Sequence, residues 1–379
     1  HARWIDPASP YHRDFKISGI APIDPKWWDE TATYLQQNGV ICYEQDWLNE
    51  IFEYSPEMAS TPGVGEAFTD NMARAAQSKQ MSLQYCMATP RFFLEGSKYG
   101  NLTSIRTSGD RFERGKWNDF IYTSALASAL GIWPWADVFK SPETENLLIA
   151  TLSAGPVGTG DAMGKESKEN IMRAARPDGV IVKPDVALIP TDATVLADAR
   201  GEHTPLIAWT YTDHGPLRTA YVFAFTRKGD APAVKFSPAA LGLSTPVWVY
   251  DVFAKTAQKL SAGQDYQGVV GPTGASYLIL APVTQSGIAL LGDDGKFVSM
   301  GKQRIPALKE TPRALTVTVA FAAGESAVTL HGCAPAAPTV KVGGGKAAPV
   351  AYDAATQQFT VAVSPAPGQS AVTVTLSPP

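Results

Sequence analysis

Two short segments hold the residues whose types and spacing best suit chemistry. Residues 43–47 read Tyr-Glu-Gln-Asp-Trp and residues 106–110 read Arg-Thr-Ser-Gly-Asp, and each follows a stretch typical of a strand. About two strand–helix units of ~30 residues each would fit between Asp46 and Asp110. In a parallel barrel the carboxyl ends of the strands share one face. The spacing therefore predicts both carboxylates on one rim, two strands apart.

Two carboxylates that face each other across a pocket are the groups needed to cleave a glycosidic bond. One attacks or stabilises the anomeric carbon, and the other gives a proton to the leaving oxygen. Tryptophan rings suit the apolar faces of sugars, and the same part of the chain holds Trp47, Trp117, Trp133 and Trp135. An aspartate that ends a strand can equally be a turn or helix-capping residue. The residues alone leave both interpretations open.

The first part of the chain reads as alternating strands and helices. Asp24 and Pro25 are favoured where a helix begins and Asn38-Gly39 where it ends, so a helix is predicted over 25–37. Further helices are predicted around 68–75 and 116–129. Strands are predicted over 15–20, 40–46, 81–88, 102–107, 132–138 and within 147–157. This alternation predicts a parallel sheet, either doubly wound or a barrel.

The second part of the chain has a different pattern. After about residue 205, short Val/Thr/Ala alternations are broken by Gly and Pro, as in an all-β sandwich. Strands are predicted over 205–211, 219–225, 247–250, 276–280, 287–291, 314–321, 327–330 and 372–376. The predicted domains are residues 1–200 and residues 201–379.

Five segments, in order along the chain, resemble those of the clan D retaining α-glycosidases, which hold the α-galactosidases and raffinose synthases. They are residues 39–46 (Gly-Val to a terminal Asp), 106–110 (Arg-x-x-x-Asp), 133–141, 154–161 and 176–179 (Arg-Pro-Asp-Gly). The resemblance implies a (β/α)8 barrel, of which residues 1–200 hold the later strands, followed by a C-terminal β-sandwich. It also implies Asp46 as nucleophile and Asp110 as general acid/base of a double displacement that retains the α configuration.

The resemblance extends to the residues around this pair. Arg106 is expected beside the ionised carboxyls, and Asp137 is expected either to bind a sugar hydroxyl or to hold a loop. Clan galactosidases have Lys two residues before the nucleophile, whereas this chain has Glu44. Glu44 lies on the same side of its strand as Asp46, so galactose specificity is open. The expected substrate-binding residues are Glu44, Trp47, Arg106, Trp133, Trp135 and Asp137.

Several alternatives stay open. Asp119 could replace Asp110 as proton donor. The leading interpretation is a galactosidase-like hydrolase acting on an oligosaccharide or glycoside. A raffinose synthase-like transglycosylase would use the same chemistry with another acceptor. A non-catalytic carbohydrate-binding protein would keep the shape without turnover.

The number of predicted strands is too small for the barrel. A (β/α)8 barrel needs eight strands in about 250 residues, and six are predicted before residue 190. We therefore expect an N-terminal chain or fragment to complete the barrel. The alternative is that Arg3-Trp4-Ile5-Asp6 and another stretch supply the missing strands.

Composition narrows the classes of partner. A net charge of −4 and the absence of a basic run argue against nucleic acid. No apolar stretch approaches the ~20 residues needed to cross a bilayer. The three cysteines show no zinc spacing, and no metal or cofactor is expected. A saccharide-processing role and a first residue other than Met suggest a periplasmic or secreted protein.

Overall fold

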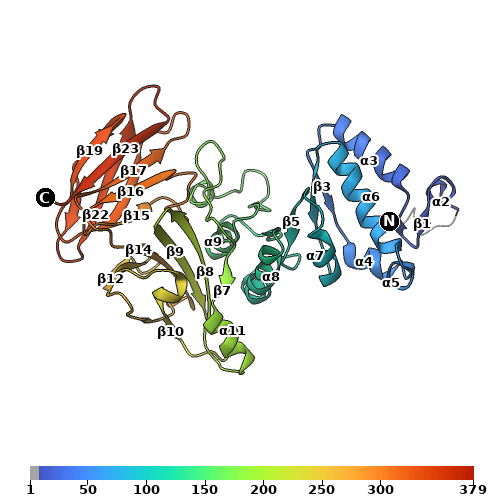
Figure 1. Cartoon of the computed structure of the whole chain (residues 1–379), viewed down its shortest axis with the longest axis horizontal. Coiled ribbons are helices and arrows are strands. Elements are labelled where there is room, and N and C mark those ends of the chain that lie inside the picture. Colours follow the sequence, from blue (N-terminus) through green and yellow to red (C-terminus); the bar gives the residue numbers. More distant parts are fainter. Residues whose placement is uncertain (1–7) are drawn as a thin grey trace. The chain divides into compact units, whose positions relative to one another are not determined.

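The computed structural model describes residues 8–379 of the chain (Figure 1). The prediction of a strand at residues 3–6 lies outside these residues. The chain divides into two compact units: His1–Arg111 with Leu126–Asp137, and Phe112–Ala125 with Val138–Pro379. The domain boundary near residue 200 stays a prediction.

A four-stranded parallel sheet forms the centre of the first unit. Its strands are β3 (Cys42–Gln45), β4 (Ser82–Tyr85), β5 (Leu102–Arg106) and β6 (Trp133–Trp135), in that spatial order. All pairs are parallel. Four of the predicted strands are therefore confirmed, and β3 and β5 are two strands apart with β4 between them.

Helices pack against one face of this sheet (Figure 1). The longest helices of this unit are α3 (Pro25–Gln37) and α6 (Val64–Ser78). The shorter helix α7 (Pro90–Gly96) also packs against the sheet. The α3 helix begins as predicted, because the Asp24 side chain accepts the Lys26 amide and Pro25 follows it. Trp28 of α3 meets Phe68 of α6 edge to face at 5.6 Å, and burying each such ring contributes about 1.5–3 kcal/mol. The smaller helices are α2 (Pro10–Asp14), α4 (Leu48–Glu53) and α5 (Glu57–Ser60).

One predicted strand forms only in part and outside the parallel sheet, and another is wrong. Residues 15–20 form part of a short antiparallel hairpin, β1 (Ile17–Ser18) and β2 (Ala21–Pro22), outside the parallel sheet. Gly19 makes the turn with φ 59°, and a Cβ there would fall 2.1 Å from the Tyr54 carbonyl oxygen. Residues 147–157 lie largely in helix α9 (Thr144–Leu152). Its last seven residues are all buried, and an apolar run buried on every side looks the same in a helix as in a strand.

The second unit is mostly antiparallel β-structure. Its six-stranded sheet has the order β12-β11-β14-β9-β8-β7. These strands are Thr256–Leu260, Val247–Asp251, Ala275–Pro282, Leu217–Phe225, Leu206–His214 and Ile189–Pro190. A two-stranded sheet pairs β10 (Ala233–Phe236) with β13 (Tyr266–Val269). The remaining helical segments are η1 (Arg114–Lys116), α8 (Trp117–Ala129), α10 (Lys168–Ile171), α11 (Asp192–Ala199) and η2 (Pro238–Leu241).

Two further sheets complete the all-β part. One has the order β15-β18-β22-β20 with β21 beside β22, comprising Ala289–Asp293, Val328–Cys333, Gln358–Pro365, Gly345–Ala347 and Ala351–Asp353. The other, β16-β17-β23-β19, comprises Ala307–Thr311, Ala314–Ala320, Ala371–Ser377 and Thr339–Gly343. Alternate residues of β17, β22 and β23 are buried, as facing sheets require. The predicted fold class, an incomplete set of barrel strands followed by all-β structure, is confirmed.

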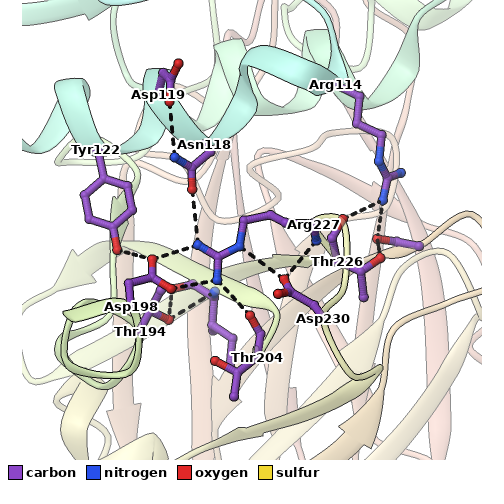
Figure 2. A network of polar contacts seen from close by, with 12 residues as sticks. Arg114, Asn118, Asp119, Tyr122, Thr194, Asp198, Thr204, Thr226, Arg227 and Asp230 are labelled. Carbon is purple, nitrogen blue, oxygen red and sulfur yellow. Dashed lines mark hydrogen bonds and ion pairs between the residues drawn. The ribbon is translucent and has the colours of Figure 1, made fainter. Parts of the chain in front are cut away.

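A polar network around Arg227 ties α8, α11 and the end of β9 together within the second unit (Figure 2). The guanidinium donates twice to Asp198, at 2.7 Å each, and its Nε donates to Asp230 at 3.1 Å. Its Nη1 also donates to Asn118 Oδ1 at 3.3 Å. Asp198 in turn accepts the Tyr122 hydroxyl at 2.5 Å. Each carboxylate in this network is held by donors of the chain itself.

No helix in residues 8–379 is long and apolar enough to span a membrane.

Candidate active site

Polar and aromatic side chains line the face of the parallel sheet opposite the hydrophobic core. Strand register places Glu44 beside Gln84, Gln84 beside Ser104, and Ser104 beside Trp133. The Ser104 hydroxyl donates to Gln84 Oε1 at 2.9 Å, which confirms that these two side chains share a face. The core residues Leu83, Tyr85 and Ile105 alternate with this row and therefore point the other way.

The next row of the same face lies at the carboxyl ends of the strands. Asp46 follows β3, Cys86 follows β4, and Arg106 ends β5 beside Trp135 of β6. The Cys86 amide donates to the Gln45 carbonyl at 3.0 Å, so the β3–β4 register continues past the strand ends. The sheet thus brings one carboxylate, one thiol, one guanidinium and one indole to a single rim.

Asp46 is fixed at the start of a turn. Its Oδ1 accepts the Trp47 amide at 2.7 Å, and its carbonyl accepts Gln45 Nε2 at 2.7 Å. Trp47 has φ 60°, in the left-handed region, and makes no side-chain capping bond to α4. A non-glycine residue in this conformation carries strain. The turn holds the Asp46 carboxyl half-buried at the rim and leaves Trp47 43% exposed beside it.

Arg106 contacts both of the other acidic residues near the rim, Asp110 and Asp137. A single nitrogen, Nη1, contacts Asp137 Oδ2 at 2.5 Å and Asp110 Oδ1 at 2.9 Å. The Asp137 amide donates to Ser108 Oγ at 2.8 Å, which ties the loops after β5 and β6 together. Burial alone would lower the pKa of Arg106, but nearby Cys86, Asp137 and Asp110 outweigh it and raise that pKa. The guanidinium stays charged between two carboxylates.

The exposure of the acidic partners differs. The Asp110 side chain is 73% exposed, whereas that of Asp137 is 21% exposed and that of Arg106 is 8% exposed. The Asp137 carboxylate pairs with Arg106 and its amide with Ser108, and both roles expected for it, holding a loop or binding a sugar hydroxyl, stay predictions. Asp110 projects from the cluster and is free to meet a ligand.

Cys86 was not predicted as part of this site. Burial, a hydrogen bond with Asp46 and the negative charges of Asp46 and Glu44 raise the pKa of its thiol, while Arg106 acts in the opposite direction. The thiol therefore lies among Asp46, Glu44 and Arg106, the residues that the sequence singled out from two separate strands. The sequence does contain an indication of this position. Cys86 directly follows β4, the strand between β3 and β5, and the carboxyl ends of neighbouring parallel strands reach the same rim.

The remaining predicted residues lie at the edges of this face. Glu44 is exposed on β3, Trp133 is 37% exposed on β6, and Trp135 is half-buried next to Arg106. Asp119 belongs to the second unit, where it accepts Asn118 Nδ2 at 3.2 Å (Figure 2). In the described part of the chain, no group of three or more His, Cys, Asp or Glu side chains is arranged to hold a metal ion.

Comparison with known proteins found similarity at the level of solved structures. A GH27 β-L-arabinopyranosidase from Geobacillus stearothermophilus matches with a TM-score of 0.49 and 14% identity, over 68% of this chain and 62% of that enzyme. An Arthrobacter globiformis isomaltodextranase in complex with panose matches with a TM-score of 0.43 and 12% identity, over 93% of this chain and 72% of the other. A Bacteroides fragilis protein provisionally described as an α-galactosidase/melibiase matches with a TM-score of 0.44 and 14% identity, over 67% and 57%.

No family model and no curated protein matches the chain. The structural neighbours include a protein described as an α-galactosidase/melibiase, the group that the sequence resembles. The matched segment spans less than two thirds of the arabinopyranosidase. At identities of 14% and TM-scores below 0.5 these neighbours assign no activity to this chain, and the function must be argued from the site.

Proposed function

We propose that this chain carries the catalytic rim of a retaining α-glycosidase of galactosidase-like type. The observation that supports it most is the convergence of Asp110 and Asp137 on one nitrogen of Arg106, on the rim that also holds Asp46. Carboxylates kept close to the largely buried side chain of Arg106 and open to solvent on one side suit glycosidic cleavage. The exposed carboxyl of Asp110 is open to proton exchange with a substrate and water.

In this mechanism Asp46 attacks the anomeric carbon. The bond to the leaving oxygen breaks as Asp110 gives that oxygen its proton, and a glycosyl–Asp46 ester forms. Water then attacks the same carbon, gives its proton to Asp110 and releases Asp46, so the α configuration is retained. The Trp47 amide orients the Asp46 carboxyl for this attack. Asp110 must leave Arg106 when it is protonated, and its exposure allows that movement.

The sugar would lie along the polar face of the sheet. Trp47, Trp133 and Trp135 offer ring surfaces for its apolar faces, and Glu44 accepts hydrogen bonds from its hydroxyl groups. Clan galactosidases have a lysine at this position, which donates hydrogen bonds, whereas Glu44 accepts them. This difference changes which arrangement of sugar hydroxyls the site would bind. The identity of the sugar is therefore best determined with a panel of aryl α-glycosides of galactose, glucose, N-acetylgalactosamine and β-L-arabinose configuration.

Additional strands are part of the proposal. Strand β3 lies at one end of the four-stranded sheet, and Ile41 is 80% exposed with Cys42 and Glu44 also exposed. Such an edge attracts further strands. We propose that another polypeptide segment pairs there and completes the barrel. Intact mass and denaturing gels of the active material test this: activity from a single 40 kDa chain without a companion would rule it out.

The decisive experiment is covalent trapping. An activated 2-deoxy-2-fluoro α-glycoside should leave a glycosyl adduct on the peptide that contains Asp46, and Asp46→Asn should lose both the adduct and turnover by several orders of magnitude. Asp265→Asn is the matched control, because Asp265 forms only an exposed pair with Lys235 in the second unit, and it should keep both. Turnover that persists in Asp46→Asn would refute the proposal. Product analysis with and without a sugar acceptor would separate hydrolysis from transglycosylation.

A further inference from the structure

A separate cavity of about 960 Å³ is formed entirely by residues of the second unit. Its walls are the start of α9, the hairpin between β11 and β12, and the loop between β13 and β14. Pockets for small molecules typically measure about 300–1,000 Å³. None of the residues of the candidate active site takes part in it, so it would bind its own ligand.

Arg173 supplies an unused cationic group in this cavity. Its guanidinium stacks on the Phe297 ring at 4.2 Å and forms no hydrogen bond or ion pair with another residue in the described part of the chain. Burial lowers the pKa of Arg173, although the charges of Tyr277 and Glu169 act in the opposite direction. A half-buried guanidinium without an acceptor leaves its planar fork of donors available for a bidentate anion.

Arg114, which lines the same cavity, differs from Arg173 because its guanidinium is held by hydrogen bonds within the chain. It donates to the carbonyls of Thr273 and Gly274 at 2.7 Å each and covers the Trp117 ring at 5.2 Å. Lys255 is a second cation in the lining and is exposed. The free positive charge of the cavity therefore comes from Arg173 and Lys255.

Aromatic and acidic groups complete the lining. Phe253 is 36% exposed, and Trp117 is fixed by a hydrogen bond from Nε1 to Asn146 Oδ1 at 2.7 Å. Asp251 already accepts the amides of Phe253 and Ala254 at 2.9 Å. Glu145 is half-buried at the start of α9, where its carboxylate can accept hydrogen bonds from hydroxyl groups.

We propose that this cavity binds a hexuronic acid unit of an acidic saccharide. The sugar carboxylate pairs with Arg173, the apolar face of the ring lies on Phe253, and ring hydroxyls donate to Glu145. Neutral sugars lack the partner for Arg173, and simple anions leave the aromatic wall unused. The cavity is thus a binding site separate from the proposed chemistry at Asp46.

Calorimetric titration of the full chain tests this, with Asp46→Asn as the background so that turnover does not intervene. The ligands are galacturonate, glucuronate, galactose and acetate. A hexuronate should bind saturably and at least about tenfold more tightly than galactose or acetate, because galactose lacks the carboxylate that pairs with Arg173 and acetate lacks the ring that lies on Phe253. Arg173→Gln should weaken hexuronate binding about tenfold or more, and Phe253→Ala several-fold.

Arg313→Gln is the matched control, since Arg313 lies in the exposed turn between β16 and β17 and should leave binding unchanged. Three results would overturn the inference. They are no hexuronate binding, equal binding of acetate, and unchanged binding by Arg173→Gln with circular dichroism confirming that the variant is folded. Because the background lacks the proposed nucleophile, the outcome does not depend on whether the chain is a glycosidase.

Discussion

Two arginines of this molecule, Arg106 and Arg227, each lie between two aspartates, yet the two clusters differ. Arg227 donates to Asp198 through two nitrogens and to Asp230 through a third (Figure 2). Asp230 is 3% exposed and Asp198 24%. At Arg106 both aspartates meet one nitrogen, and Asp110 is 73% exposed.

The difference separates an arrangement that holds a fold together from one suited to a reaction. In the Arg227 network the carboxylates accept hydrogen bonds from several donors of the chain, including the Tyr122 hydroxyl. These carboxylates therefore already have partners within the fold. At the rim of the first unit, Asp110 keeps most of its surface in water. An acid/base must exchange protons with substrate and water, and the exposure of Asp110 suits the role proposed for it.

The largest effect is expected for Asp110→Asn. Removal of an acid/base lowers turnover by about 10²–10⁴-fold, while an exposed carboxyl contributes at most about 1 kcal/mol to the free energy of unfolding. The loss should be smaller with a dinitrophenyl leaving group, which departs without a proton. Steady-state kinetics and urea unfolding measure both quantities. If Asp119→Asn loses turnover and Asp110→Asn does not, the assignment of the proton donor is wrong.

The reverse result is expected for Asp198→Asn. The change leaves Arg227 without its bidentate partner, and the free energy of unfolding should fall by about 2–4 kcal/mol. Turnover per folded molecule should stay constant. Asp265→Asn is the control, because its pair with Lys235 is exposed and 3.6 Å long and should contribute less than about 1 kcal/mol. Equal stability of the two variants would remove the contrast between the clusters.

The sequence predicts much of the candidate site because its signals are local. A strand, a terminal Asp and a following helix recur at β3 and β5, and parallel strands bring such ends together. Asp24, Pro25 and Asn38 mark the ends of α3 in the same local way. Arg106 and Asp110 are four residues apart, at the end of β5 and in the loop that follows it, so the sequence predicts that they lie close together.

The rest depends on contacts that no local pattern encodes. Arg227 meets Asn118 and Asp198 from distant parts of the chain, and nothing in their flanking residues indicates that pairing. The sequence predicts a strand where α9 forms, because burial on all sides removes the periodicity that distinguishes a helix from a strand. Likewise, Gly19 turns a single predicted strand into a hairpin through a close approach to Tyr54.

The pH dependence of stability should expose the Arg227 network on both sides of neutrality. The hydrogen bonds from Arg227 lower the pKa of Asp198 below its usual 3.8. Its contribution is therefore complete above that value and is lost as the pH falls through the lower value. Burial and the bond to Asp198 raise the pKa of Tyr122 from 10.0 to about 12. That contribution is complete below pH 10 and is lost as the pH rises through about 12.

Urea unfolding of Asp198→Asn and Tyr122→Phe across the pH range measures the loss of stability at low pH (the acid limb) and at high pH (the alkaline limb). Asp198→Asn should flatten the acid limb and Tyr122→Phe the alkaline limb, relative to the parent chain. Asp110→Asn, by contrast, should leave the alkaline limb as it is in the parent chain. A parent and an Asp198→Asn variant with the same acid limb would show that Asp198 does not stabilise the fold through Arg227.

The smallest expected effect concerns chemical labelling of the cysteines, which measures how accessible their thiols are in each unit. Cys42 is exposed on β3, whereas Cys86 and Cys333 are buried and burial raises the pKa of both thiols. Because the thiolate is the reactive form, iodoacetamide at pH 8 should modify Cys42 in the folded chain and all three cysteines after unfolding. Peptide mass spectrometry identifies the sites. Pairing of further strands with β3 would protect Cys42 and leave Cys333 unchanged. Labelling of Cys333 as fast as Cys42 would instead show that the second unit is no more closed than the first.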